Sequence, residues 1–294
     1  MDNYERYHFD VNGFIVVEDI LTTDEVAALN EAIDNNPDQV HIREGELRLS
    51  GAAKQHGGRA APLLKGSHGR GDIMNILNWP KPWCQPFRDL LTQPRTMRYM
   101  LELIGDGFRY GNANGISMTA GAEGFLFHGG GTPRGPYYYE FQDGRMWNGL
   151  MAVCYQLTDI NPGDGGFACI PGSHRANYAC PNDVRRLDAH PEWFRHLPMK
   201  AGSALIFTEA LTHGTFPWTA SHERRTLLYR YGSGDMVFGS GPAIHPDGYE
   251  SFKDELTPLQ RALMTPPFAS RRPSLVPLIE EEEACQARAS GGPA

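Results

Sequence analysis

A series of short apolar runs, between about Gly111 and Tyr231, sets the fold class of this chain. The runs read FLFH, LMAVCYQL, GFACIPG, SALIFT and TLLYRY, and clusters of glycine, proline and aspartate separate them. Short runs that are rich in β-branched and aromatic side chains predict strands, and the residues between them are typical of turns. Several such strands in succession predict an all-β sandwich or barrel instead of a sheet built from βαβ units.

The segments before this stretch carry both strand and helix signals. The run GFIVV at residues 13–17 predicts a short strand. Thr22 and Glu25 have the spacing of a capping box, and the residues after them place apolar side chains on one helical face. Pro94 opens a second predicted helix, because proline is favoured at the first helical position. We therefore expect a mainly β fold with flanking helices.

The length and composition favour one domain. The chain has 294 residues, of which 40% are apolar, and this is ample for one sizeable core. We expect the domain to cover residues 1–270, with its barrel core at about 111–240. The remaining segment, RRPSLVPLIEEEEACQARASGGPA at 271–294, predicts a mobile C-terminal tail.

Charge and cysteine content exclude several classes of protein. The net charge is −8, and no cluster of lysine and arginine exists that could follow a phosphate backbone, so we expect no nucleic-acid partner. No apolar run approaches the length of a membrane span, and the first residues, MDNYERYHFD, lack the apolar region of a signal peptide. The five cysteines show no C-x-x-C spacing, which argues against a disulfide framework or a zinc knuckle. We expect a cytoplasmic protein that acts on a small molecule.

Two histidines and one arginine stand in a context that suggests chemistry. His128 ends the run GFLF and is followed by three glycines, His213 follows another strand-like run, and Arg224 comes eleven residues later. Imidazoles on two strands, with a carboxylate and open coordination positions, form the facial-triad site of non-haem Fe(II) oxygenases. A buried arginine suits a carboxylate ligand because its planar guanidinium binds both oxygens. From the residues alone, the histidines could equally be hydrogen-bonded core groups, and Arg224 could be a solvated charge like its neighbour Arg225.

These residues belong to a larger pattern. The chain also contains YHFDVNGFIVVEDILTTDEVAALNEAI near its start, LTDINPGDGGFACIPGSH at 157–174, and HGT at 213–215 before the arginine. Together they resemble the phytanoyl-CoA dioxygenase family, over nearly the whole chain to about residue 240. The resemblance implies a double-stranded β-helix (jelly roll, cupin-like) core, with Fe(II) and the co-substrate 2-oxoglutarate bound inside its mouth.

The resemblance also implies roles for individual residues. His128 is the first metal ligand, His213 is the second, and Arg224 anchors 2-oxoglutarate. Thr215 lies where the family often has a hydroxyl that contacts the same carboxylate. Tyr155 matches a position that the family commonly fills with an aromatic side chain beside 2-oxoglutarate, although a core aromatic would give the same pattern.

The sequence departs from the family at the third ligand. The family reads His-x-Asp at the first site, whereas this chain reads His128-Gly129-Gly130. Strand side chains alternate, so position 130 should share the face of His128. Another carboxylate could fill the gap, and Glu209 is the best candidate because positions 209, 211 and 213 would share one face of a strand.

The weaker candidates for the third ligand are Glu140 and Asp143. We expect an Fe(II)- and 2-oxoglutarate-dependent oxygenase that hydroxylates or otherwise oxidises a small molecule. A halogenase with chloride at the Gly130 position is one alternative. A cupin-like or non-catalytic metal-binding barrel is the other.

Overall fold

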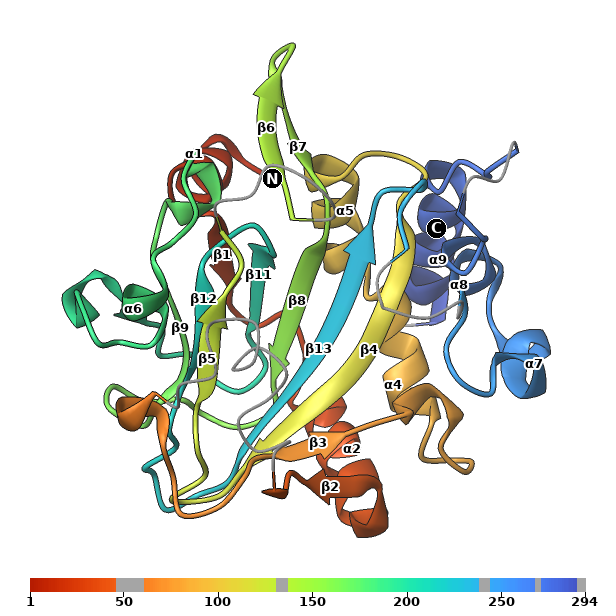
Figure 1. The fold of residues 1–294 in the computed structure, drawn as a ribbon. Helices are drawn as coiled ribbons and strands as arrows, with labels where there is room; N and C mark the ends of the chain where they lie inside the picture. Colours follow the sequence, from red (N-terminus) through yellow and green to blue (C-terminus); the bar gives the residue numbers. More distant parts are fainter. Residues whose placement is uncertain (46–60, 131–136, 238–243, 268–270, 290–294) are drawn as a thin grey trace.

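Two antiparallel β-sheets pack face to face in the computed structural model, which describes residues 1–45, 61–130, 137–237, 244–267 and 271–289 (Figure 1). The larger sheet has the strand order β1-β11-β8-β13-β4-β3-β2, and the smaller has the order β10-β9-β12-β5. The larger sheet consists of β1 (Phe14–Val17), β11 (Ala204–Thr208), β8 (Met151–Gln156), β13 (Arg224–Gly232), β4 (Arg109–Met118), β3 (Gly71–Ile73) and β2 (Val40–Ile42). The smaller sheet consists of β10 (Arg195–His196), β9 (Gly166–Cys169), β12 (His213–Phe216) and β5 (Phe125–His128).

Strands β1, β5, β8, β9, β11 and β13 coincide with the predicted apolar runs, and the predicted jelly-roll class is confirmed. A separate hairpin, β6 (Tyr139–Gln142) and β7 (Arg145–Asn148), projects from the body of the molecule (Figure 1). Neighbouring strands in each sheet are often far apart in sequence. For example, β1 pairs with β11, and β13 lies between β8 and β4. The sheets thus bring side chains from distant segments into one interior.

Side-chain alternation divides the interior into two cores. On β8, Met151, Val153 and Tyr155 belong to a helix-side core, which the larger sheet shares with the helices. Ala152 and Cys154 on the same strand belong to an inter-sheet core between the two sheets. All six residues of β8 are therefore buried, which explains why its sequence is apolar up to Gln156.

Most of the helices cover the outer face of the larger sheet (Figure 1). The predicted helix after residue 22 is α2 (Thr23–Asp34), and Thr22 and Glu25 form the predicted capping box. The helix opened by proline is α5 (Pro94–Leu103). The other α-helices are α1 (Asn3–Asn12), α4 (Gln85–Asp89), α6 (Asn182–Arg185), α7 (Tyr249–Phe252), α8 (Pro258–Leu263) and α9 (Val276–Ala289). Within the described ranges, no helix combines the length and apolar character needed to cross a bilayer.

The prediction of a mobile tail at 271–294 is wrong for the helix α9. Leu275 and Ile279 are buried in the helix-side core. The carboxylate of Glu282 accepts hydrogen bonds from Thr92 (2.5 Å) and Thr257 (2.9 Å), which tie the helix to the segments before α5 and α8. These tertiary contacts hold the segment, and its acidic sequence alone gives little sign of them.

Candidate active site

The two predicted histidines lie side by side on neighbouring strands. His128 on β5 is in register with His213 on β12, and their ring centroids are 4.2 Å apart. The Nδ1 atoms of His128 and His213 lie 3.0 Å and 2.8 Å from the carbonyl oxygens of Leu126 and Leu211, respectively. A carbonyl can only accept, so each Nδ1 carries the proton and each Nε2 keeps its lone pair for another partner. This is the orientation that metal-binding imidazoles usually have.

Glu209 completes a three-residue cluster. Its Oε2 lies 3.5 Å from the Nε2 of His213, and one potential ligand atom from each of His128, Glu209 and His213 lies within 4.8 Å of the other two. No other group of histidine, cysteine, aspartate and glutamate in the described part of the chain meets this condition. Two imidazole nitrogens and one carboxylate oxygen are the donor set of a non-haem Fe(II) site, so these residues fit that metal.

Glu209 reaches the cluster by a different geometry from the one predicted. Glu209 was predicted to lie on one strand with His213, but β11 ends at Thr208 and β12 begins at His213. Glu209 lies in the turn between the two strands. The tight turn, and not strand alternation, brings the carboxylate beside the imidazole.

Gly130 does not occupy the position that was predicted for it. Strand β5 ends at His128, and Gly129 and Gly130 have φ angles of +75° and +69°, so strand alternation stops there. A Cβ at Gly130 would lie 2.2 Å from the Oγ1 of Thr212, which leaves no room for an aspartate. The carbonyls of both glycines accept hydrogen bonds from Arg185 at 2.9 Å and 3.3 Å, which fix this turn.

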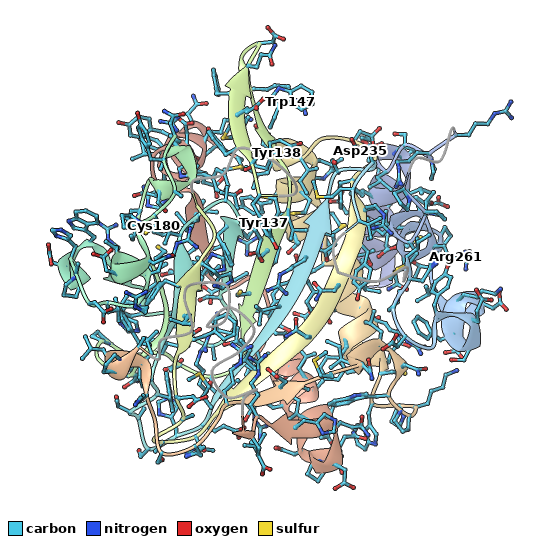
Figure 2. All side chains as sticks on the ribbon, in the orientation of Figure 1. Tyr137, Tyr138, Trp147, Cys180, Asp235 and Arg261 are labelled. Carbon is cyan, nitrogen blue, oxygen red and sulfur yellow. The ribbon has the colours of Figure 1, made fainter. Side chains whose placement is uncertain are left out.

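The alternative acidic residues do not approach the cluster. Glu140 and Asp143 are exposed on the β6–β7 hairpin. Trp147, from the same hairpin, projects away from the sheets (Figure 2). Trp218 is buried in the inter-sheet core, and its Nε1 donates to the carbonyl of His222 at 2.6 Å.

The electrostatics of the cluster suit metal binding. Burial opposes ionisation of Glu209, but the charge of Arg230, assisted by His213 and His128, lowers the pKa of this carboxyl to about 2. Burial, with a smaller effect of His213, lowers the pKa of His128 to about 3, and burial also lowers the pKa of His213. Near neutral pH the cluster therefore holds one carboxylate and two neutral imidazoles, the protonation states that metal binding requires. The 3.5 Å approach of Glu209 to His213 is accordingly not an ion pair.

A cavity of about 90 Å³ adjoins the cluster, and Arg224 and Thr215 line it with the two histidines. Arg224 is 2% exposed, and burial lowers its pKa to about 10, so it stays cationic at neutral pH. Its Nη1 approaches the sulfur of Met118 at 3.2 Å, and its Nε has no hydrogen-bond partner among the described residues. Because buried polar groups are nearly always paired, this guanidinium is suited to an anionic ligand.

Tyr155 is not in this cavity, so the prediction of a contact with 2-oxoglutarate is wrong. Its hydroxyl lies 2.7 Å from the Oγ1 of Thr96, in the helix-side core. The preceding residue, Cys154, lines the cavity instead. Strand β8 is buried on both faces, so its sequence does not show which side faces the site.

Sequence reasoning missed three polar residues that line the cavity: Arg70, Asn114 and Arg230. The position of Arg230 could have been predicted from the sequence. It lies six positions after Arg224 on one strand, and strand side chains alternate with a period of two, so both arginines point to the same face. The positions of Arg70 and Asn114 could not have been predicted, since sheet topology alone brings them to the site.

The model of the phytanoyl-CoA dioxygenase family matches residues 9–226. No curated protein matches the chain by sequence. HygX from Streptomyces hygroscopicus, solved with nickel, 2-oxoglutarate and hygromycin B bound, has 19% identity and a TM-score of 0.61, over 79% of this chain and 88% of HygX.

Two further solved structures come from nogalamycin biosynthesis. The non-haem α-ketoglutarate-dependent epimerase SnoN has 14% identity and a TM-score of 0.58, over 92% of this chain and 97% of SnoN. The carbocyclase SnoK, also α-ketoglutarate-dependent, has 16% identity and a TM-score of 0.57, over 92% of this chain and 94% of SnoK. At these identities the structures show a shared fold. The family match covers most of the chain and includes His128, His213 and Arg224, and it confirms the predicted class, an oxidoreductase that depends on Fe(II) and 2-oxoglutarate: the chain belongs to the phytanoyl-CoA dioxygenase family.

Proposed function

We propose that His128, Glu209 and His213 hold Fe(II) in this protein, and that Arg224 and Thr215 bind the distal carboxylate of 2-oxoglutarate. The observation that carries this proposal is one cavity lined by two kinds of group. His128 and His213 of the His–Glu–His cluster line it, and so does a buried arginine whose Nε has no hydrogen-bond partner in the described chain. A dicarboxylate that also chelates the metal would satisfy both groups.

When bound, Fe(II) supplies the activation of dioxygen, with 2-oxoglutarate as the two-electron reductant, for oxidation of a substrate C–H bond. The protein's residues position the reactants and exclude water. The Nδ1–H bonds of His128 and His213 to backbone carbonyls fix the imidazoles. Phe167 and Phe207 line the cavity, and their rings pack against the imidazole of His213, so this part of the wall is apolar.

We infer that the substrate is a small molecule and that the outcome is hydroxylation or a related oxidation. The structure of HygX with hygromycin B bound supports this inference, because the shared fold there holds a small molecule beside 2-oxoglutarate and a metal. Halogenation requires an open coordination position in place of the carboxylate. Glu209 provides a carboxylate at the cluster, and the side of Gly130 is filled by Thr212, so the geometry favours oxygenation.

The competing hypothesis is that the protein is a non-catalytic barrel. It would leave no reason for a buried arginine with an unpaired Nε to face two neutral imidazoles across one cavity. The experiment that tests the proposal is an anaerobic titration of the metal-free protein with Fe(II) and 2-oxoglutarate, observing the metal-to-ligand charge-transfer band.

We expect the band to appear at one equivalent of each in the wild-type protein. His128→Ala and His213→Ala should abolish it, because each removes one nitrogen donor. His174→Ala, which alters a histidine outside the cavity, serves as the matched control and should retain the band. Stoichiometric iron and native 2-oxoglutarate consumption in either of the first two variants would show that the ligand assignment is wrong.

A further inference from the structure

Arg230 connects the proposed iron ligand Glu209 to strand β4. Its Nε donates to the Oε1 of Glu209 at 2.6 Å. Its Nη1 lies 3.2 Å from the Oδ1 of Asn114 and 3.4 Å from the Oδ1 of Asn112. The guanidinium is thus held from two sides, by a carboxylate and by two side-chain amides.

An irregularity in the pairing of β13 and β4 creates this arrangement. Arg230 is in register with Asn112, and Tyr231 with Tyr110, so Gly111 is an extra residue on β4. In a regular strand Tyr110 and Asn112 would share one face. The bulge separates them: Tyr110 joins the helix-side core, and the Asn112 amide turns toward Arg230.

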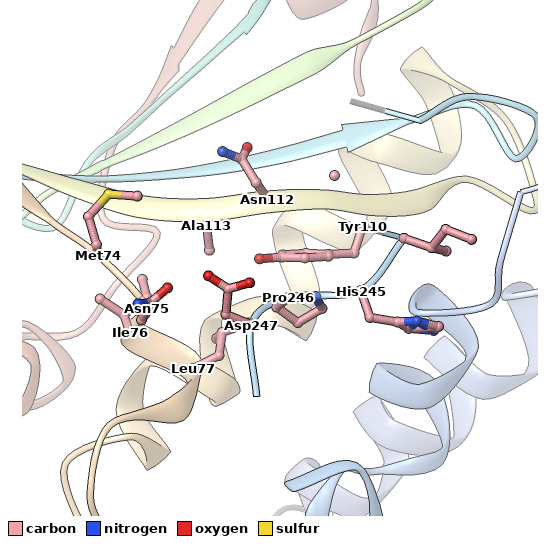
Figure 3. Close-up of a pocket in the computed structure, with 12 residues that line it drawn as sticks. Met74, Asn75, Ile76, Leu77, Tyr110, Asn112, Ala113, His245, Pro246 and Asp247 are labelled. Atoms are coloured by element: carbon pink, nitrogen blue, oxygen red, sulfur yellow. The ribbon is translucent and has the colours of Figure 1, made fainter. Parts of the chain in front are cut away.

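Figure 3 shows this separation at a cavity of about 190 Å³ on the helix side of β4. Tyr110 and Asp247 point into that cavity, whereas Asn112 extends from the opposite side of the strand. The Asn112 side chain is therefore available to Arg230.

The two oxygens of Glu209 face different partners. Oε1 accepts the short, charge-assisted bond from Arg230, and Oε2 lies 3.5 Å from the Nε2 of His213, where the cluster converges. A carboxylate can bind a metal through one oxygen or both. Arg230 holds Oε1 by a hydrogen bond, and Oε2 is the oxygen that approaches the imidazole of His213.

We propose that Arg230 is a positioning residue that limits Glu209 to one-oxygen coordination. This inference rests on the proposed function. An octahedral Fe(II) with two imidazoles and one carboxylate oxygen retains three positions, which are the number needed for the two donor atoms of 2-oxoglutarate and for dioxygen. Coordination by both oxygens would take one of them and weaken 2-oxoglutarate binding.

The competing explanation is that Arg230 is only the counter-ion that makes a buried Glu209 tolerable. Loss of a buried partner would then lower stability and metal affinity together. If Arg230 is a positioning residue, its loss should affect the two affinities differently. Iron should still bind, and 2-oxoglutarate should bind less tightly.

The test uses the full-length protein and five variants: Arg230→Gln, Arg230→Lys, Glu209→Gln, Asn112→Ala/Asn114→Ala, and Arg225→Gln. Arg225 is the matched control, because it also lies on β13 in ion pairs, with Glu223 and Asp34, and does not line the cavity. Three quantities are measured anaerobically. They are Fe(II) affinity by chelator competition, 2-oxoglutarate affinity from the charge-transfer band, and the Co(II) ligand-field spectrum of the protein without 2-oxoglutarate.

We expect Arg230→Gln to bind Fe(II) within about threefold of wild type and to bind 2-oxoglutarate roughly tenfold more weakly. Its Co(II) spectrum should also change. Arg230→Lys should restore most of the 2-oxoglutarate affinity, because an ammonium can still hold Oε1. The double asparagine variant, which keeps the charge pair, should fall between the two, and Arg225→Gln should match wild type.

Unchanged 2-oxoglutarate affinity in Arg230→Gln, or in the double asparagine variant if Arg230→Gln does not fold, would overturn the positioning role. Parallel loss of Fe(II) affinity and stability with an unchanged Co(II) spectrum would overturn it in favour of the counter-ion. Glu209→Gln separates this failure from failure of the proposed ligand set. If Glu209→Gln binds Fe(II) as well as wild type does, the ligand set itself is wrong.

Discussion

The arginines around the cavity differ in the partners that the protein gives them. Arg230 has Glu209 at 2.6 Å, and Arg70 has Asp72 at 3.2 Å. Arg224 has a methionine sulfur at Nη1 and, in the described ranges, no hydrogen-bond partner at Nε. A buried guanidinium with unmet hydrogen-bonding capacity is unfavourable until an anion arrives, so Arg224 is the side chain that best accounts for co-substrate affinity.

Arg224→Ala should raise the dissociation constant for 2-oxoglutarate on the order of a hundredfold and leave the affinity for Fe(II) nearly unchanged. The physical reason is the loss of a charge-assisted carboxylate contact from a residue that lines the cavity but is not a member of the metal cluster. Anaerobic titration with each ligand measures both effects. Arg225→Ala is the control and should match wild type. A loss of affinity in Arg225→Ala, and none in Arg224→Ala, would move the role to the neighbouring residue.

His174, the histidine of the PGSH segment, makes structural contacts outside the cavity. The Nε2 of His174 lies 3.2 Å from the carbonyl oxygen of Asp10, and its ring packs edge-on against Tyr139. Burial, with a smaller effect of Arg175, lowers its pKa to about 4. Because the unfolded chain takes up this proton near pH 6.5, the stabilising effect of a neutral His174 is present above that pH and is lost as the pH falls toward 4.

We therefore predict that His174→Gln flattens the pH dependence of stability. Between pH 6.5 and 4.5, the free energy of unfolding of the metal-free wild type should fall by about 2 kcal/mol more than that of the variant. Urea denaturation of both proteins across this range measures the difference. Parallel curves would mean that His174 is protonated in the folded protein at the acidic end.

At the scale of elements, local signals predicted the strands and the helix caps, and tertiary contacts decided the rest. The capping box before α2 and the proline that opens α5 are local, and both predictions were confirmed. The end of β5 at His128 was not predicted, because the positive φ angles of Gly129 and Gly130 follow from packing against the turn after β11. Helix α9 was not predicted, for two reasons. Its acidic run EEEE is typical of a solvent-exposed segment, and its few apolar residues do not define one helical face.

The contacts of α9 lead to a prediction for its buried isoleucine. Ile279 is 1% exposed in the helix-side core, so Ile279→Ala should lower the free energy of unfolding by about 3 kcal/mol through lost burial and a cavity. Glu280→Ala, on the exposed side of the same helix, is the control and should change stability by about 0.5 kcal/mol or less. Chemical denaturation measures both. An equally small effect for Ile279→Ala would show that α9 does not contribute to the core in solution.

At the scale of the whole molecule, the site depends on the meeting of both sheets. The smaller sheet supplies the histidines, the larger supplies Arg224 and Arg230, and the turn from β11 to β12 supplies Glu209. The spacing from His213 to Arg224 could be recognised in the sequence because both residues lie in one continuous stretch. The contribution of Arg70 could not be predicted, since it depends on the order of strands across the sheet.

Ligands that join the two sheets should stabilise the entire fold. We predict that Fe(II) and 2-oxoglutarate together raise the melting temperature of the metal-free protein. A ligand present at a hundred times its Kd should add about 2.7 kcal/mol to the free energy of unfolding. Chloride should add nothing beyond its effect as a salt, because Glu209 already supplies the carboxylate donor. Anaerobic thermal denaturation in chloride and in sulfate at matched ionic strength checks this. A chloride-specific shift of the melting temperature would contradict the assignment of Glu209.

The pairing of β1 with β11 has a consequence for how the chain is made. Phe14 is in register with Phe207, so the early strand FIVV meets its partner only after roughly 190 further residues have left the ribosome. Until then an apolar strand with unpaired backbone groups remains exposed, a state that favours aggregation. Contacts so distant in sequence also slow folding. The nascent chain should thus depend on chaperones for most of its synthesis, and the pace of translation through residues 204–207 should influence its yield.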